Sequence, residues 1–233
     1  KGMGGSMHLF DQHSGFYGSV PIVSGTVALA VGAAFDAKRN KTKNVGVAFI
    51  GDGAVEEGVV HESLNLSKIL PAPTVFVLEN NLYASHMHMT LRQPKESTTR
   101  FADANLIKNE MIDGNDILEV YEVSKSLINF SRDSGEPSFL EAFTYRHFGH
   151  VDWRKDVDVG IERSKKNLAE WLKRDPISRL LLGMKEKAIL SDKDFSNIQT
   201  KLSEDIKNSW EKALKDPYPE DKDLLSKVYS YED

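Results

Sequence analysis

Two polar motifs each follow an apolar run, at the positions from which side chains reach a ligand in a parallel sheet. Asp52 lies in a Gly-Asp-Gly turn directly after the apolar run 45–50, and Asn81 lies in an Asn-Asn pair shortly after the run 74–78. In open parallel sheets ligands bind beyond the carboxyl ends of the strands. A carboxylate and an amide oxygen, completed by phosphate oxygens, are ligands that Mg²⁺ prefers. The two motifs therefore predict a cation site beside an anionic group.

The elements that must position these motifs are a strand, a helix and a second strand. The runs 45–50 and 74–78 are continuously apolar, which is typical of strands buried on both faces. Between them, apolar residues recur at helical spacing, and Pro71 ends the pattern. These residues are Val55, Val59, Val60 and Leu64. A right-handed crossover is the expected connection, and it would place both motifs at one edge of the sheet.

The rest of the chain extends this pattern. We expect a loop over 1–24, a small-residue helix over 22–37, a short strand over 117–123, the start of a helix over 125–130, and a strand over 138–145. Charged residues and helical apolar spacing dominate the chain after Val151. The predicted fold is a doubly wound, mostly parallel α/β sheet with a helical C-terminal extension. The predicted division is an α/β core over 1–150 and an active-site loop with packed helices over 151–233.

Composition limits the function classes. The chain has 233 residues, 40% of them hydrophobic, and a formal net charge of −5. A mildly acidic chain disfavours binding to nucleic acid or anionic membranes. The absence of cysteine excludes disulfides, thiolate metal ligands and a cysteine nucleophile, and fits a reducing compartment. The abrupt start at Lys1 predicts that this sequence is a piece of a longer protein.

Five spaced motifs together resemble a known family. They occupy residues 2–8, 16–18, 22–23, 51–81 and 144–150. In this order they are similar to the α subunits of the E1 components of 2-oxo acid dehydrogenases, the pyruvate, branched-chain and acetoin enzymes. The resemblance extends over essentially the whole chain. It implies that thiamine diphosphate and Mg²⁺ are the cofactors.

The resemblance also implies roles for residues at the two turns. Asp52 and Asn81 would be side-chain ligands of Mg²⁺, with the backbone carbonyl of Tyr83 as a third ligand. Gly53 and Ala54 would offer backbone N–H groups to the diphosphate.

Four further residues acquire roles from the resemblance. Arg146 would neutralise diphosphate charge with its guanidinium group. His150 would be the active-site histidine, hydrogen-bonded to diphosphate or to the reacting group. Val23 and the backbone at Pro21 would lie along the aminopyrimidine end of the cofactor.

The function implied is oxidative decarboxylation of a 2-oxo acid, with pyruvate foremost, or cleavage of acetoin. The acyl group would pass to a lipoyl group of an E2 acyltransferase. The expected partner is an E1 β subunit in an α2β2 heterotetramer, and that subunit would supply the glutamate that activates the cofactor. The α chain alone would then be inert. A bacterial source and a cytoplasmic location are expected.

Two other functions fit some of these motifs. The segment 51–58 also resembles transketolases, so the chain could be half of a split transketolase-like enzyme. A non-catalytic scaffold subunit could also retain this fold. Among the remaining polar residues, His86 and His88 are expected to bind no metal, and Glu56 with Glu57 suits a helix N-terminus. The role of His147 stays open.

Overall fold

The structure, a computed structural model, describes residues 7–151 and 163–223. The chain divides into two compact units. One is Ile22–Leu180, and the other combines Lys1–Pro21 with Leu181–Asp233. In the described ranges, we find no helix with the length and apolar character that crossing a membrane requires.

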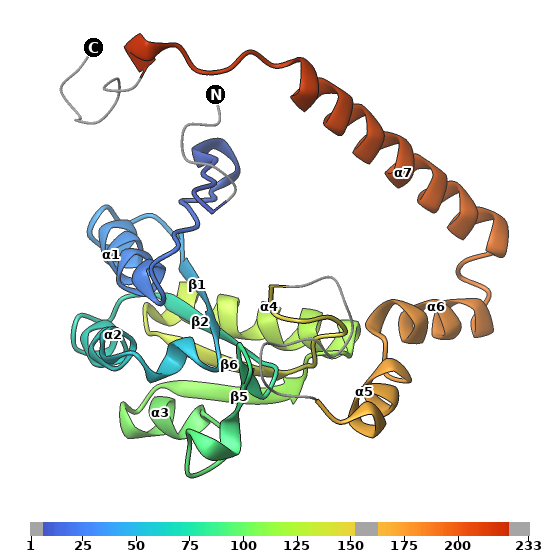
Figure 1. The fold of residues 1–233 in the computed structure, drawn as a ribbon. Coiled ribbons are helices and arrows are strands. Elements are labelled where there is room, and N and C mark those ends of the chain that lie inside the picture. The colour runs from blue at the N-terminus through green and yellow to red at the C-terminus, as the bar shows by residue number, and fades with distance from the viewer. Residues whose placement is uncertain (1–6, 152–162, 224–233) are drawn as a thin grey trace. The chain divides into compact units, whose positions relative to one another are not determined.

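The larger unit contains a sheet of four parallel strands in the order β1, β2, β6, β5 (Figure 1). Their bounds are Gly46–Gly51 for β1, Thr74–Asn80 for β2, Lys108–Asp113 for β5 and Ser138–Phe143 for β6. The register pairs Gly51 with Glu79 and Asn80 with Phe143. Because all neighbours run parallel, the carboxyl ends of the strands meet at one edge, as the sequence predicts.

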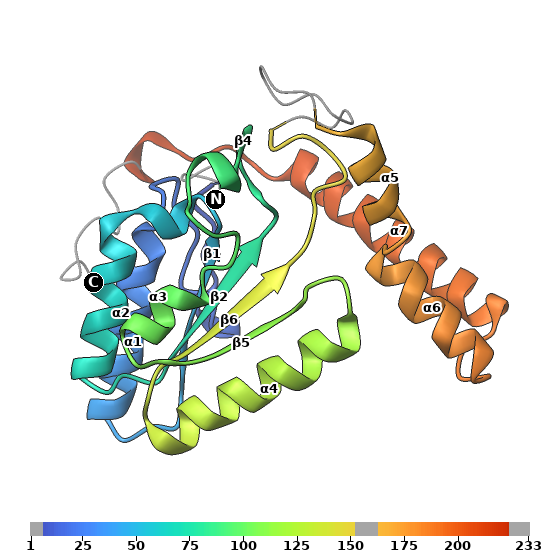
Figure 2. The same ribbon diagram turned by 90° about the horizontal axis from the view of Figure 1, so that it is seen from below.

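Helices cover both faces of this sheet (Figure 2). One face carries α1 (Gly25–Arg39), α2 (Gly58–Ile69) and α3 (Thr99–Ala104), and the other carries α4 (Ile117–Ser134). The prediction of a doubly wound α/β fold is confirmed. Short elements complete the carboxyl edge: the 3-10 turns η2 (Ala54–Glu56) and η3 (Met89–Leu91), and the hairpin of β3 (Tyr83–Ala84) and β4 (Met87–His88).

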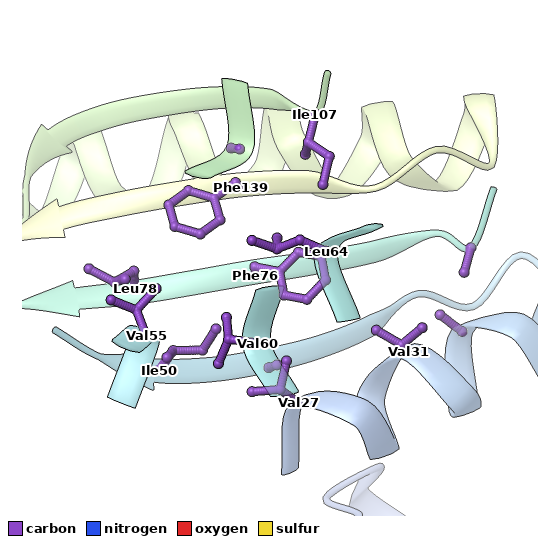
Figure 3. Close-up of a cluster of buried hydrophobic side chains, with 14 residues drawn as sticks. Val27, Val31, Ile50, Val55, Val60, Leu64, Phe76, Leu78, Ile107 and Phe139 are labelled. Atoms are coloured by element: carbon purple, nitrogen blue, oxygen red, sulfur yellow. The ribbon is translucent and has the colours of Figure 1, made fainter. Parts of the chain in front are cut away.

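The main core lies between β1, β2, β6 and the three helices α1, α2 and α3 (Figure 3). Alternate residues of β2 serve the two faces, since Phe76 and Leu78 join this core while Val77 packs against the α4 cluster. Helix α1 lies directly on β1. A Cβ added to Gly46 would be 2.2 Å from the carbonyl oxygen of Ala30, so only glycine permits this approach.

One predicted element is wrong. Residues 117–123 were expected to form a strand, but they begin α4. The Asp116 side chain caps this helix by accepting hydrogen bonds from the backbone amides of Leu118 and Glu119, at 3.1 and 3.2 Å. The strand at this edge of the sheet is instead β5, which is only partly buried and carries no continuous apolar run.

The helices predicted after Val151 are present as α5 (Lys165–Leu172), α6 (Pro176–Glu186) and α7 (Asp192–Lys215). Helix α5 belongs to the larger unit, where its Trp171 ring stacks on Tyr145 with 5.5 Å between centroids. The second unit holds η1 (Gln12–Ser14), α7 and η4 (Asp221–Asp223). Ser191 and Asp194 form a capping box at the start of α7.

A buried carboxylate on β6, that of Glu141, binds the loop before α3 through hydrogen bonds. Glu141 is 0% exposed. It accepts hydrogen bonds from Asn80 Nδ2 at 2.8 Å, Ser97 Oγ at 2.8 Å, and the backbone amides of Thr98 and Thr99 at 2.9 and 3.2 Å. Since an ionised carboxylate only accepts, it satisfies a set of donors that no neutral amide could match.

Replacing this carboxylate should therefore destabilise the protein strongly. We expect Glu141→Gln to lower the free energy of unfolding by about 2–4 kcal/mol, because the new amide would face buried donors with donors of its own. Urea denaturation measures this loss. Glu136→Gln is the matched control, since Glu136 forms a partly exposed ion pair with Lys68 and should cost less than about 1 kcal/mol. Equal losses for both variants would contradict the proposed importance of the Glu141 network.

Candidate functional site

The two polar motifs of the sequence meet at the carboxyl edge of the sheet. Asp52 follows β1, Asn81 follows β2, and the strands pair in register up to Gly51 and Glu79. Asp52 is 1% exposed, and the backbone of Asn81 is one of the neighbours that act on the pKa of its carboxyl group, after burial and Arg92. The structure therefore brings together the two residues that the sequence predicts as side-chain cation ligands.

The chain reverses sharply after β2 and forms a hairpin beside the Gly-Asp-Gly turn. The Asn80 side chain accepts a hydrogen bond from the amide of Leu82 at 3.1 Å, and the Asn81 side chain accepts one from the amide of Tyr83 at 3.2 Å. Leu82 has a φ of 69°, in the left-handed region. This turn holds Tyr83, the predicted carbonyl ligand, two residues beyond Asn81.

The hairpin packs closely on the turn after β1. A Cβ added to Gly53 would be 2.5 Å from the Cβ of Ala84, so the contact requires glycine at this position. The Ser24 hydroxyl donates to the carbonyl of Ala54 at 2.7 Å and ties the start of α1 to the same turn. Val23, which precedes Ser24, is 59% exposed, and its role at the aminopyrimidine end of the cofactor stays a prediction.

The segment after β6 reaches the hairpin from the other side. Arg146 Nη2 donates to the carbonyl of Ser85 at 2.6 Å. Arg163, which is 1% exposed, donates to the carbonyls of Arg146 at 2.6 Å and Phe148 at 3.0 Å. His150 follows in this segment and is exposed.

Several predicted contributions are not placed by these contacts. Pro21 is exposed and belongs to the second unit, so its role at the aminopyrimidine stays a prediction. Residues 2–6 of the first motif and residues 152–162 of the predicted active-site loop lie outside the described residues.

Sequence reasoning missed one residue of this site, Arg92. Its side chain is 7% exposed, and its Nη2 contacts Asp52 Oδ2 at 2.5 Å. Nη1 pairs with Glu56 and lies 3.4 Å from the carbonyl of Asp52, while Nε donates to the carbonyl of Met87 at 3.1 Å. Arg92 comes in a loop of mixed polar residues with no motif around it, so the sequence offers no signal for this contact.

The electrostatics of Asp52 follow from its burial. Loss of hydration raises the pKa of this carboxyl above its usual range, and the Arg92 guanidinium only partly offsets the effect. A raised pKa means that the ionised form is destabilised in the folded protein. A bound cation would relieve that cost.

The donor set fits a hard divalent cation bound together with a phosphate ligand. Asp52 offers a carboxylate in the turn after β1, and the chain after β2 offers the Asn81 amide oxygen and the Tyr83 backbone carbonyl oxygen. In the residues that the structure describes, His, Cys, Asp and Glu form no group of three or more that could hold a metal by themselves. Mg²⁺, which needs few protein ligands when phosphate oxygens complete its shell, suits this arrangement.

The parallel α/β fold, with polar turns converging at one edge, defines a protein of the class that binds ligands beyond the carboxyl ends of its strands. Comparison with known proteins identifies the family within that class. The family described as "Dehydrogenase E1 component" matches residues 1–222. The chain belongs to this family, and the predicted resemblance to its α subunits is confirmed.

Several curated proteins are similar over nearly the whole chain. The α subunit of acetoin:2,6-dichlorophenolindophenol oxidoreductase from Bacillus subtilis is 38% identical over 100% of this chain and 68% of its own length. The pyruvate dehydrogenase E1 α subunit of Rickettsia bellii is 32% identical over 98% of this chain and 69% of its own length. A Campylobacter jejuni transketolase structure matches 54% of this chain and 20% of its own chain, with 21% identity and a TM-score of 0.46. The two curated relatives do not favour the split-transketolase and scaffold alternatives.

The raised pKa of Asp52 leads to a pH prediction. A proton and a cation compete for one carboxylate, so cation affinity should decline as the pH falls through this raised pKa, earlier than for an ordinary aspartate near 3.9. Mn²⁺ binding with thiamine diphosphate, measured against pH in the complex with the β subunit, tests this. The binding of Mn²⁺ by the free cofactor at each pH is subtracted.

Asp113→Asn serves as the control for this titration. Burial alone would raise the pKa of Asp113, but hydrogen bonds from Arg174, the Asn115 amide and Arg179 lower it below its usual range. Because Asp113 is outside the proposed ligand set and its pKa is lowered, not raised, its replacement should not move the midpoint. A wild-type midpoint at or below that of an ordinary aspartate would contradict the role of Asp52.

Proposed function

We propose that this chain is the α subunit of a two-chain E1 dehydrogenase and provides half of a site for thiamine diphosphate and Mg²⁺. The observation that supports this most strongly is the convergence of Asp52 and Asn81 under the hairpin at the carboxyl edge of the sheet. Membership in the E1 family gives that convergence its chemical interpretation. Asp52, Asn81 and the Tyr83 carbonyl would hold the cation.

The remaining residues would bind and orient the diphosphate. Gly53 and Ala54 follow Asp52, where backbone N–H groups can donate to phosphate oxygens. Arg146, held at the hairpin by the Ser85 carbonyl, would add positive charge to the same anion. His150 would donate a proton or a hydrogen bond at the reacting atoms. The bound cofactor would supply the carbanion chemistry, and the protein would orient it and exclude water.

The proposed substrate is a 2-oxo acid, with pyruvate foremost, and acetoin is the second candidate. Both proposals rest on relatives, because one is named as a pyruvate dehydrogenase subunit and another as an acetoin oxidoreductase subunit. In the pyruvate reaction the acyl group would pass to a lipoyl group of an E2 acyltransferase. The proposed partner is a β subunit in an α2β2 assembly. A cytoplasmic location stays a prediction.

Reconstitution with the β subunit tests this function. The assembled complex should reduce dichlorophenolindophenol with pyruvate or acetoin when thiamine diphosphate and Mg²⁺ are present, and the α chain alone should be inactive.

Asp52→Ala should abolish Mg²⁺-dependent cofactor binding in calorimetry, because it removes the only carboxylate of the proposed ligand set. His150→Ala should lower kcat by about 100-fold or more while the cofactor still binds.

His86→Ala is the matched histidine control, since His86 is exposed and has no assigned role. This variant should retain wild-type turnover. Unchanged cofactor binding in Asp52→Ala would refute the cation site. Turnover of a ketose phosphate without any 2-oxo acid or acetoin activity would favour a transketolase-like enzyme, and a complex that binds cofactor without turning over any of these substrates would favour a scaffold.

A further inference from the structure

Arg92 joins three separate parts of the site. Its guanidinium contacts the Asp52 carboxylate, the Asp52 carbonyl and the Glu56 carboxylate. Its Nε donates to the carbonyl of Met87 in β4. A single buried side chain thus connects the turn after β1 to the hairpin that follows β2.

These contacts occupy one of the two oxygens of the Asp52 carboxylate and leave the other for a cation. Arg92 binds Oδ2. A carboxylate can give one oxygen to a guanidinium and the other to a cation, provided that its rotation is fixed. The Asp52 backbone carbonyl is bound by the same arginine, so the position of the residue and the rotation of its side chain are set together.

The local charge remains attractive to a cation. By formal charge, Asp52 and Glu56 contribute −2 and Arg92 contributes +1, so the formal charge of the cluster is −1. Arg92 therefore reduces the cost of burying Asp52 without cancelling the field that draws a divalent ion. A guanidinium serves this purpose better than an ammonium, because its planar fork reaches several acceptors at fixed angles.

We propose that Arg92 is a positioning residue for the cation site, one that orients Asp52 for metal binding and locks the β3–β4 hairpin over the Gly-Asp-Gly turn. The inference rests on the proposed function, because it assumes that Asp52 is a cation ligand. Without the Arg92 guanidinium, Asp52 would remain buried but its side chain could rotate. The hairpin would also lose the hydrogen-bonded connection that Arg92 makes between Met87 and Asp52. Metal affinity should fall more than the rate at saturating metal.

Mn²⁺ titration followed by electron paramagnetic resonance, on the α/β complex with saturating thiamine diphosphate, tests the proposal. Arg92→Lys keeps the charge but loses the fork, and should weaken Mn²⁺ affinity by about tenfold or more. Arg92→Gln should weaken it further, and in both variants kcat at saturating Mn²⁺ should fall much less than the affinity. Glu56→Gln removes a partner of Arg92 without touching Asp52 and should weaken affinity by a smaller factor.

Arg100→Lys is the matched control. Arg100 lies at the start of α3 and donates to Gln93 and to the Ser97 carbonyl, so its replacement should leave Mn²⁺ affinity within about twofold of wild type. Unchanged or tighter Mn²⁺ binding in the Arg92 variants would overturn the proposal, as would an equal loss in Arg100→Lys. If the wild-type complex binds no Mn²⁺ with the cofactor, the proposed function itself fails, which is a different result.

Discussion

The parallel pairing of β1 with β2 is the constraint on which the rest of the site depends. Residue-by-residue register from Gly46 and Thr74 to Gly51 and Glu79 brings the next residues of both strands to the same edge. If the same two strands were antiparallel, their carboxyl ends, and so the two turns, would be separated by the length of a strand. Helices α1 and α2 stabilise this pairing because they bury one face of both strands. They leave the carboxyl edge of the sheet to the polar residues of the site.

Burying carboxylates at this edge costs free energy, which neighbouring hydrogen-bond donors and charges offset. Backbone and side-chain donors surround the Glu141 carboxyl group under the loop and satisfy both of its oxygens. Asp52 has fewer partners, and burial outweighs the influence of Arg92 on its pKa. Glu141 thus has hydrogen-bond donors for both oxygens and serves a structural role. For Asp52, in contrast, Arg92 only partly offsets the cost of burying the ionised carboxylate. That difference is typical of a ligand site beside a structural network.

Much of this arrangement follows from the sequence. Continuous apolar runs predicted β1 and β2, and a strand was also expected over 138–145, where β6 lies. The position of Asp52 and Asn81 just after the two apolar runs predicted their meeting. Two features could not be predicted. Residues 117–123 have strand-like composition, but the Asp116 cap and packing on β5 and β6 make them helical. Arg92 reaches Asp52 across 40 positions of chain through a hairpin whose path no local pattern specifies.

The most direct test of the cation site is a crystal structure of the α/β complex with thiamine diphosphate and Mn²⁺, with anomalous scattering measured at the manganese edge. We expect one anomalous peak in each α subunit, about 2.1 Å from an Asp52 carboxylate oxygen, the Asn81 amide oxygen and the Tyr83 carbonyl. A peak elsewhere, or a bound cofactor with no manganese near Asp52, would contradict this assignment.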